Sequence, residues 1–220
     1  MTTWPAAVLF DMDGTLIESH ANVERAWATW AAQRDLDVQA VLAMAHGLPA
    51  DVTVAHWFPE ASADEILALA ADQLRLQYED VEDIERIEGV TELLEFLDDT
   101  ALPWAVYTSA DAELARVRLG AAGLEPPVLV TRDQVEHGKP APDGYLRAAR
   151  LLAVPAEECI VIEDTDVGLA AGRSAGMNTV GVRGAVGDLP IRSISELHLW
   201  LAVKSAPTMS DGPGLPLPGF

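Results

Sequence analysis

The chain has 220 residues, half of them hydrophobic, and a formal net charge of −21. Its length suits one large domain or a domain with a small insertion, and its apolar content favours a packed globule. The acidity argues against a nucleic-acid partner, because such binding needs Lys and Arg to neutralise phosphates. A small anion would bind only where local cations or oriented amides reverse the field, and the only lysines are Lys139 and Lys204.

The distribution of apolar residues predicts no membrane association. Apolar runs are short and interrupted by charges, and no basic segment followed by an apolar core opens the chain. The single cysteine, Cys159, lies in a strand-like apolar run and is expected to be a buried hydrophobe. One cysteine forms no internal disulfide, which fits a reducing compartment. We therefore expect a cytoplasmic protein, monomeric or weakly dimeric.

Strand-like and helical patterns alternate along most of the chain. The patterns predict strands at 6–10, 103–107, 128–131, 159–163 and 178–182, and helices at 90–99, 111–122, 143–153 and 166–175. Such alternation predicts an α/β fold, a parallel sheet flanked by helices.

The exception is a helical block between the first two predicted strands. Its segments are 21–34, 38–45, 50–57 and 63–79. A block of this size is too long for an ordinary crossover, so it predicts an inserted helical domain whose two ends lie close together. The expected division is a core of residues 1–16 and 87–204, an insertion at 17–86, and a flexible Pro/Gly/Ser-rich tail at 205–220.

The first predicted strand ends in a pair of aspartates. Asp11 and Asp13 follow the apolar run 6–10, and Gly14 breaks the strand. Residues i and i+2 of an extended segment point to the same side, so both carboxylates should face the space beyond the strand end. Two carboxylates at such a short distance repel each other unless a cation or a shared proton compensates their charge. Taken alone, the pair also fits a surface turn.

Three later features also lie at the ends of predicted strands. In chain order they are Thr108-Ser109, the loop lysine Lys139 between Gly138 and Pro140, and the acidic pair Glu163-Asp164. Each has an ordinary explanation taken singly, as a helix cap, a solvated loop lysine or a partner of a helix dipole.

Together and in this order, the four features resemble the motifs of haloacid dehalogenase superfamily hydrolases. The likeness rests on DMDGT at 11–15, Thr108, Lys139 within GKPAPD, and Glu163-Asp164, and it spans residues 6–183. It implies a Rossmann-like core with the insertion as a helical cap. Within the insertion, ESHANVERAW and MAHGLPADVTVAHWF are similar to the sugar and polyol phosphatases. The expected substrate is therefore a small phosphate monoester, a sugar or polyol phosphate.

The resemblance also implies a role for each motif residue. Asp11 would attack phosphorus and form an aspartyl-phosphate, and Asp13 would act as general acid and then general base. Mg²⁺ would be held by the Asp11 carboxylate, the Asp13 backbone carbonyl and the Asp164 carboxylate, with Glu163 binding indirectly. Thr108 and the Ser109 amide would bind phosphate oxygens. Lys139 would offset the negative charge that Asp11 and the phosphoryl group share.

Substrate choice would rest with the cap. His46, at a predicted helix break, and Glu18, just past the first loop, are the candidate substrate-binding residues. The tryptophans at 27, 30 and 57 have helical spacings that suit a cap core, and we expect them to be structural.

Two alternatives stay open. A sugar phosphate mutase resembling β-phosphoglucomutase would carry an acid–base histidine where this chain has Val23, and a cap lysine, of which residues 17–86 have none. A non-catalytic binding protein on the same fold is the other alternative, because fold does not fix function.

Overall fold

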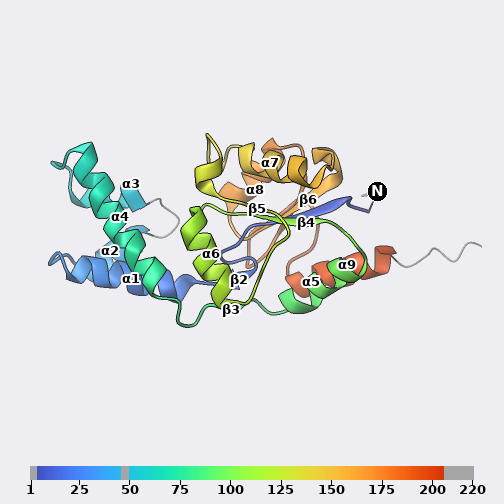
Figure 1. Ribbon diagram of the computed structural model, residues 1–220, viewed down its shortest axis with the longest axis horizontal. Coiled ribbons are helices and arrows are strands. Elements are labelled where there is room, and N and C mark those ends of the chain that lie inside the picture. The colour runs from blue at the N-terminus through green and yellow to red at the C-terminus, as the bar shows by residue number, and fades with distance from the viewer. Residues whose placement is uncertain (1–3, 46–49, 206–220) are drawn as a thin grey trace, which may run out of the picture.

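A five-stranded parallel sheet forms the centre of the computed structural model, which describes residues 4–45 and 50–205 (Figure 1). The strand order is β5-β4-β1-β6-β7. The strands are β1 (Ala7–Phe10), β4 (Trp104–Tyr107), β5 (Leu129–Val130), β6 (Cys159–Glu163) and β7 (Asn178–Gly181). All five lie where the apolar runs predict them, and the expected α/β class is confirmed.

Helices cover both faces of this sheet. They are α5 (Val90–Asp99), α6 (Ala112–Ala121), α7 (Asp143–Leu152), α8 (Asp166–Ser174) and α9 (Ile194–Ser205), with short 3-10 turns at Arg132–Gln134 and Ala156–Glu158. Side chains of β1 alternate between the faces: Val8 and Phe10 pack in one cluster with α5, α6 and α9, whereas Ala7 and Leu9 pack in another with α7 and α8. Because β1 is fully buried between two neighbours, it reads as a continuous apolar run.

Helix α9 has no counterpart among the sequence predictions. Its buried side chains, Ile194, Leu197 and Leu201, have helical spacing and pack against α5. Leu199 and Val203, however, are 65% and 75% exposed. These apolar residues on the outer face obscure the periodicity that identifies an amphipathic helix.

The inserted helices have a core of their own. They are α1 (His20–Ala32), α2 (Val38–Ala45), α3 (Ala50–Trp57) and α4 (Ala63–Glu79), at one end of the molecule in Figure 1. Trp27 and Trp30 are buried there in an edge-to-face arrangement with their ring centroids 5.3 Å apart. The Trp30 indole donates a hydrogen bond to the Leu69 carbonyl. Trp57 is partly buried against the same cluster. The packing role expected for the tryptophans is confirmed.

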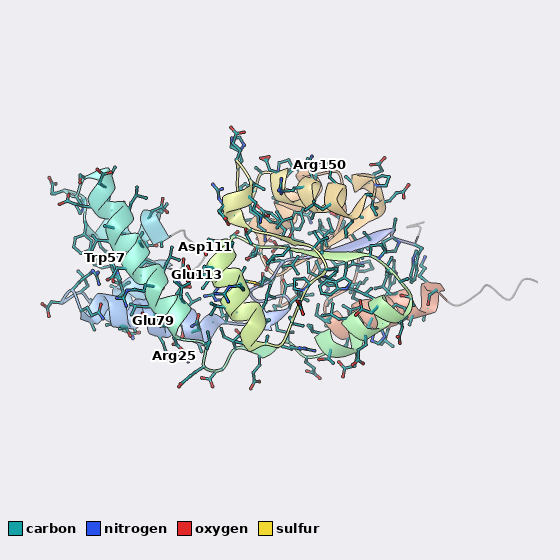
Figure 2. The ribbon with its side chains drawn as sticks, viewed as in Figure 1. Arg25, Trp57, Glu79, Asp111, Glu113 and Arg150 are labelled. Carbon is teal, nitrogen blue, oxygen red and sulfur yellow. The ribbon has the colours of Figure 1, made fainter. Side chains whose placement is uncertain are left out.

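The two connections to these helices run side by side. β2 (Ile17–Glu18) pairs antiparallel with β3 (Glu85–Arg86), so the ends of the insertion are close together, as predicted. Each strand has two residues, too few for any periodicity to reveal. A second contact lies where α4 runs beside α6 (Figures 1 and 2): the Tyr78 hydroxyl donates a 2.7 Å hydrogen bond to Asp111, the N-cap of α6.

Among the described residues, no helix is both long and apolar enough to cross a membrane.

The packing of α7 on β4 gives a test of the core. A Cβ added to Gly144 would lie 2.1 Å from the Tyr107 ring, so the helix approaches the strand only because residue 144 is glycine. We expect Gly144→Ala to lower the free energy of unfolding by about 1–3 kcal/mol, the usual effect of overpacking. Gly120→Ala in α6 is the control, because a Cβ added there has no neighbouring atom within 4 Å. It should raise the free energy of unfolding by about 0.5–1 kcal/mol, since alanine has the higher helix propensity. Equal effects in urea denaturation would contradict this packing.

Candidate active site

The sheet brings the predicted motif residues to one edge. Asp11 directly follows β1, Thr108 follows β4, and Glu163 ends β6, and these three strands are neighbours in the sheet. Because the strands are parallel, their carboxyl ends share one edge, the edge at which open α/β sheets bind ligands. Residues more than 150 positions apart in the chain, such as Asp11 and Asp164, thereby become neighbours.

Lys139 is buried between two acids. Its ammonium donates to Asp11 Oδ1 and, over 2.6 Å, to Glu163 Oε1. The Lys139 side chain is 6% exposed, and its ammonium lies 5.0 Å from the Tyr107 ring centre and 5.6 Å from that of Tyr145. Two carboxylates and two aromatic faces therefore stabilise a charge that burial alone would disfavour.

Glu163 has both carboxylate oxygens engaged. Its Oε1 accepts from the Tyr145 hydroxyl at 2.9 Å as well as from Lys139, and its Oε2 accepts from the Thr165 hydroxyl at 2.9 Å. The side chain is fully buried. A carboxylate held in this way is an anchor for Lys139 and has little freedom left to bind a ligand.

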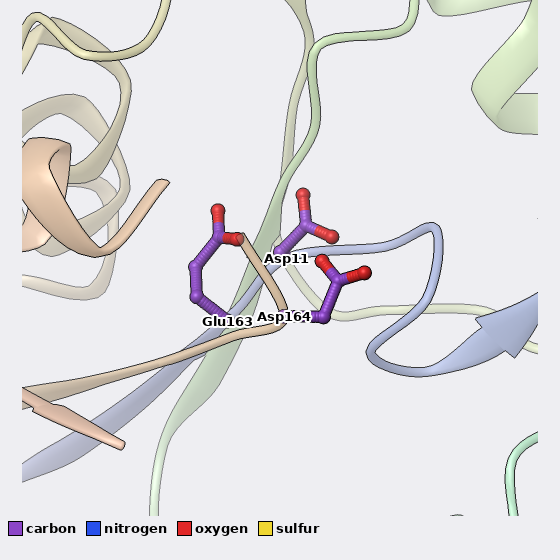
Figure 3. A group of neighbouring side chains, drawn as sticks. All are labelled: Asp11, Glu163 and Asp164. Atoms are coloured by element: carbon purple, nitrogen blue, oxygen red, sulfur yellow. The ribbon is translucent and has the colours of Figure 1, made fainter. Parts of the chain in front are cut away.

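Asp164 is different, because its Oδ1 is buried without a hydrogen-bond partner among the described residues. Oxygens of Asp11, Glu163 and Asp164 lie within 4.8 Å of one another (Figure 3). A buried, unpartnered carboxylate oxygen in an all-oxygen group fits a hard divalent cation such as Mg²⁺. Gly14 permits the approach: it has a φ of +82°, and a Cβ there would lie 2.1 Å from Asp164 Oδ2.

The electrostatics of this cluster favour a bound cation. Burial, then the negative charge of Glu163, raises the pKa of Asp11 well above its usual range, although Lys139 acts in the opposite direction. Burial and Glu163 also raise the pKa of Asp164 to about 6. For Lys139, burial lowers the pKa, but Asp11 and Glu163 outweigh it and raise the pKa above its ordinary value. The carboxylates therefore have less positive charge nearby than their ionised forms require.

The side chain of Asp13 lies outside the carboxylate cluster. Its Oδ1 accepts from the Ser19 hydroxyl at 2.6 Å and from the Arg118 guanidinium at 2.9 Å. The sequence predicts that Asp11 and Asp13 face the same space, because side chains alternate along a β-strand and residues i and i+2 point to the same side. β1 ends at Phe10 and the chain turns at Gly14, so that alternation does not extend to Asp13.

The other predicted residues occupy varied positions. Thr108 is buried after β4, where its hydroxyl accepts from the Ala110 amide at 3.0 Å, and Ser109 beside it is exposed. Glu18 accepts from Arg183 at 2.6 Å and from His20. Partial burial raises the Glu18 pKa, but those hydrogen bonds outweigh it and lower the pKa to about 2. His46 lies outside the described residues.

Sequence reasoning missed several residues that contact the motif acids, including Thr165, whose hydroxyl donates to Glu163. Tyr145 supports Glu163, and Arg118 contacts Asp13. A signal for Arg118 is present in the sequence: it lies four positions after Leu114, three after Ala115 and next to Leu119, so it falls on the buried face of α6. An arginine on an apolar helix face predicts a buried partner.

The raised pKa of Asp164 predicts a pH-dependent stability difference. In the unfolded chain its pKa is about 3.9, so between pH 4 and 6 the folded chain binds more protons and ionised Asp164 destabilises it as pH rises. Without metal, Asp164→Asn should be more stable than the parent at pH 7, with the gain vanishing near pH 4. Thermal unfolding across this range measures it, and Asp166→Asn, at an exposed acid two residues away, is the control. A gain independent of pH would contradict the assignment.

Comparisons with known proteins agree with this geometry. The model of the haloacid dehalogenase-like hydrolase family matches residues 5–176. Hexitol phosphatase A of Escherichia coli is 39% identical over 206 residues, covering 93% of this chain and 94% of that protein. The fructose-1-phosphate phosphatase YqaB of E. coli is 31% identical, covering 81% and 96%.

A solved structure has the same fold. A Thermotoga maritima protein proposed to be a β-phosphoglucomutase superposes with a TM-score of 0.70 at 26% identity, covering 90% of this chain and 98% of that one. With the motif acids and Lys139 gathered at one sheet edge, the chain belongs to the haloacid dehalogenase-like hydrolase family.

Proposed function

We propose that this protein is a Mg²⁺-dependent phosphatase that hydrolyses a sugar or polyol phosphate monoester through an aspartyl-phosphate on Asp11. The observation that carries the proposal is the buried Asp11–Lys139 pair beside Asp164, whose Oδ1 has no hydrogen-bond partner within residues 4–45 and 50–205. Hexitol phosphatase A and fructose-1-phosphate phosphatase, both similar over most of their length, support the substrate class.

Asp11 is the proposed nucleophile. Attack of its carboxylate on phosphorus forms an acyl phosphate and releases the alcohol, and water then hydrolyses the acyl phosphate, so one difficult displacement becomes two. Lys139, already bonded to Asp11, offsets the negative charge that nucleophile and phosphoryl group share. The Thr108 hydroxyl and the Ser109 amide, at the end of the adjacent strand, would bind phosphoryl oxygens.

The donors for Mg²⁺ would be the carboxylates of Asp11 and Asp164 and the backbone carbonyl of Asp13. A bound Mg²⁺ would supply charge neutralisation at the phosphoryl oxygens. Glu163 would act indirectly by holding Lys139, since its own oxygens accept from Lys139, Tyr145 and Thr165.

Asp13 is the proposed acid–base group. It would protonate the departing alcohol and then accept a proton from the attacking water. We also propose that residues 17–86, with α1 to α4, form a cap that selects the substrate, and that His46 and Glu18 are its candidate contacts. Glu18 is already paired with Arg183, so a substrate that reaches it meets an ion pair rather than a free carboxylate.

A mutase needs an acid–base group in the cap. The position at which β-phosphoglucomutases carry a histidine is Val23, a partly buried residue that packs against the core of the inserted helices. Valine transfers no proton, and residues 17–86 contain no lysine. Hydrolysis is therefore favoured over phosphoryl return to the sugar.

Replacing the nucleophile gives the direct test. We expect Asp11→Asn to lower kcat for phosphate release by more than about 10³-fold, because an amide does not form the acyl phosphate. Phosphate release from a panel of sugar and polyol phosphates, nucleotides and phosphoglycolate measures it, with and without Mg²⁺.

Asp166→Asn, at an exposed acid that follows the neighbouring strand β6, is the matched control and should keep parental turnover. Metal-independent turnover, or turnover that survives in Asp11→Asn, would refute the mechanism. Higher kcat/KM for nucleotides or phosphoglycolate than for every sugar and polyol phosphate would refute the substrate class.

A further inference from the structure

A buried arginine connects the inserted helices to the proposed acid–base residue. Arg118 lies in α6, and its side chain is 4% exposed. Its Nη1 donates to Asp13 Oδ1 at 2.9 Å. Its Nη2 donates to Asn22 Oδ1 at 3.0 Å and to Gln77 Oε1 at 2.6 Å. One guanidinium thus joins the loop after β1 to helices α1 and α4.

Asp13 is the only acid that this guanidinium contacts within the described part of the chain. The partners of the guanidinium on α1 and α4 are neutral amide oxygens. Arg118 Nε is buried and has no hydrogen-bond partner among the described residues. A buried charge is costly unless it is paired, and an apolar residue of similar size would pack α6 against α4 at least as well. The contact with Asp13 therefore explains why the position carries an arginine better than packing does.

The hydrogen bonds on Asp13 are unevenly distributed. Oδ1 accepts from both Ser19 and Arg118, whereas Oδ2 accepts from none of the described residues. Two donors on Oδ1 fix the rotation of the carboxyl group and leave Oδ2 to carry and exchange a proton.

We propose that Arg118 is a positioning residue that holds Asp13 with Oδ2 available for proton transfer, and that Asn22 and Gln77 make this orientation depend on the seating of the inserted helices. The proposal rests on the proposed phosphatase function. Gln77 is held by Gln73 at 2.8 Å, and Asn22 donates to the Asp80 carbonyl, so both amides are fixed to the insertion. A shift of α1 and α4 against the sheet would act on Arg118 and through it on Asp13.

The proposed proton transfer determines which measurement would detect a misoriented Asp13. As the bond between phosphorus and the ester oxygen breaks, Asp13 Oδ2 gives its proton to that oxygen, and the alcohol leaves neutral. An alkyl alcohol needs this proton, whereas p-nitrophenolate leaves readily without it. Because kcat/KM covers the steps up to alcohol release, a disoriented Asp13 should reduce kcat/KM for an alkyl phosphate far more than for p-nitrophenyl phosphate.

The test compares Arg118→Met and Arg118→Lys with Arg116→Met, an exposed arginine on the same helix. For the preferred sugar or polyol phosphate, we expect Arg118→Met to lower kcat/KM by about 10²-fold, within the 10²–10⁴-fold range of general acid–base catalysis. The loss with p-nitrophenyl phosphate should be at least about tenfold smaller, since that step needs little acid help. Arg118→Lys should recover part of the loss, and Arg116→Met should match the parent.

A double-mutant cycle with Asp13→Asn separates positioning from folding. If Arg118 acts through Asp13, Arg118→Met should lower kcat/KM little further in the Asp13→Asn background. Gln77→Met, which keeps Arg118, should show a smaller loss with the same leaving-group dependence. If Arg118→Met does not fold, Arg118→Lys and Gln77→Met carry the test.

Equal losses for alkyl and aryl esters, or full additivity with Asp13→Asn, would overturn the positioning role while the phosphatase function stands. A parent protein that turns over no phosphate ester, or an Asp11→Asn variant that keeps turnover, would instead refute the function itself.

Discussion

The site depends on one electrostatic constraint: three neighbouring carboxylates lie close to one another, and two of them bind one buried ammonium. Asp11 and Glu163 both accept hydrogen bonds from Lys139, and Asp164 lies beside them with one oxygen that has no partner in the described part of the chain. When all three acids are ionised, the lysine leaves two negative charges uncompensated. Burial first, and then the negative charge of Glu163, raises the pKa of both Asp11 and Asp164. A divalent cation at the cluster would compensate the two negative charges, and a phosphate ester could then enter an otherwise acidic protein.

The fold provides this arrangement through parallel strands. The motifs lie in or next to loops that follow the carboxyl ends of β1, β4, β5 and β6, and these four strands are consecutive in the sheet. The helices that return the chain pack on both faces of the sheet. In folds of this type ligands bind at the carboxyl ends of the strands. The inserted helices depart from the loop after β1, the same loop that carries Asp11 and Asp13. Through Arg118 these helices also contact Asp13, the proposed acid–base residue.

Much of this could be predicted from the sequence, because it depends on local patterns. Buried strands read as apolar runs, and motif residues at their ends meet once the sheet is parallel. The orientation of Asp13 could not be predicted, since Ser19 and Arg118 set it after the strand has ended. The position of Arg118 on the apolar face of α6 signals a buried partner, but which residues those partners are depends on the long-range contact of α6 with α1 and α4. Helix α9 escaped prediction because exposed leucine and valine mask its periodicity.

Mg²⁺ binding to the resting protein tests the central claim most directly. Titration calorimetry, run with and without inorganic phosphate, should show one Mg²⁺ site per chain in the parent and in Asp166→Asn. The site should be lost or greatly weakened in Asp164→Asn, because that variant replaces a carboxylate oxygen with an amide nitrogen and removes one negative charge from the cluster. Equal Mg²⁺ affinity in the parent and in Asp164→Asn would contradict the account.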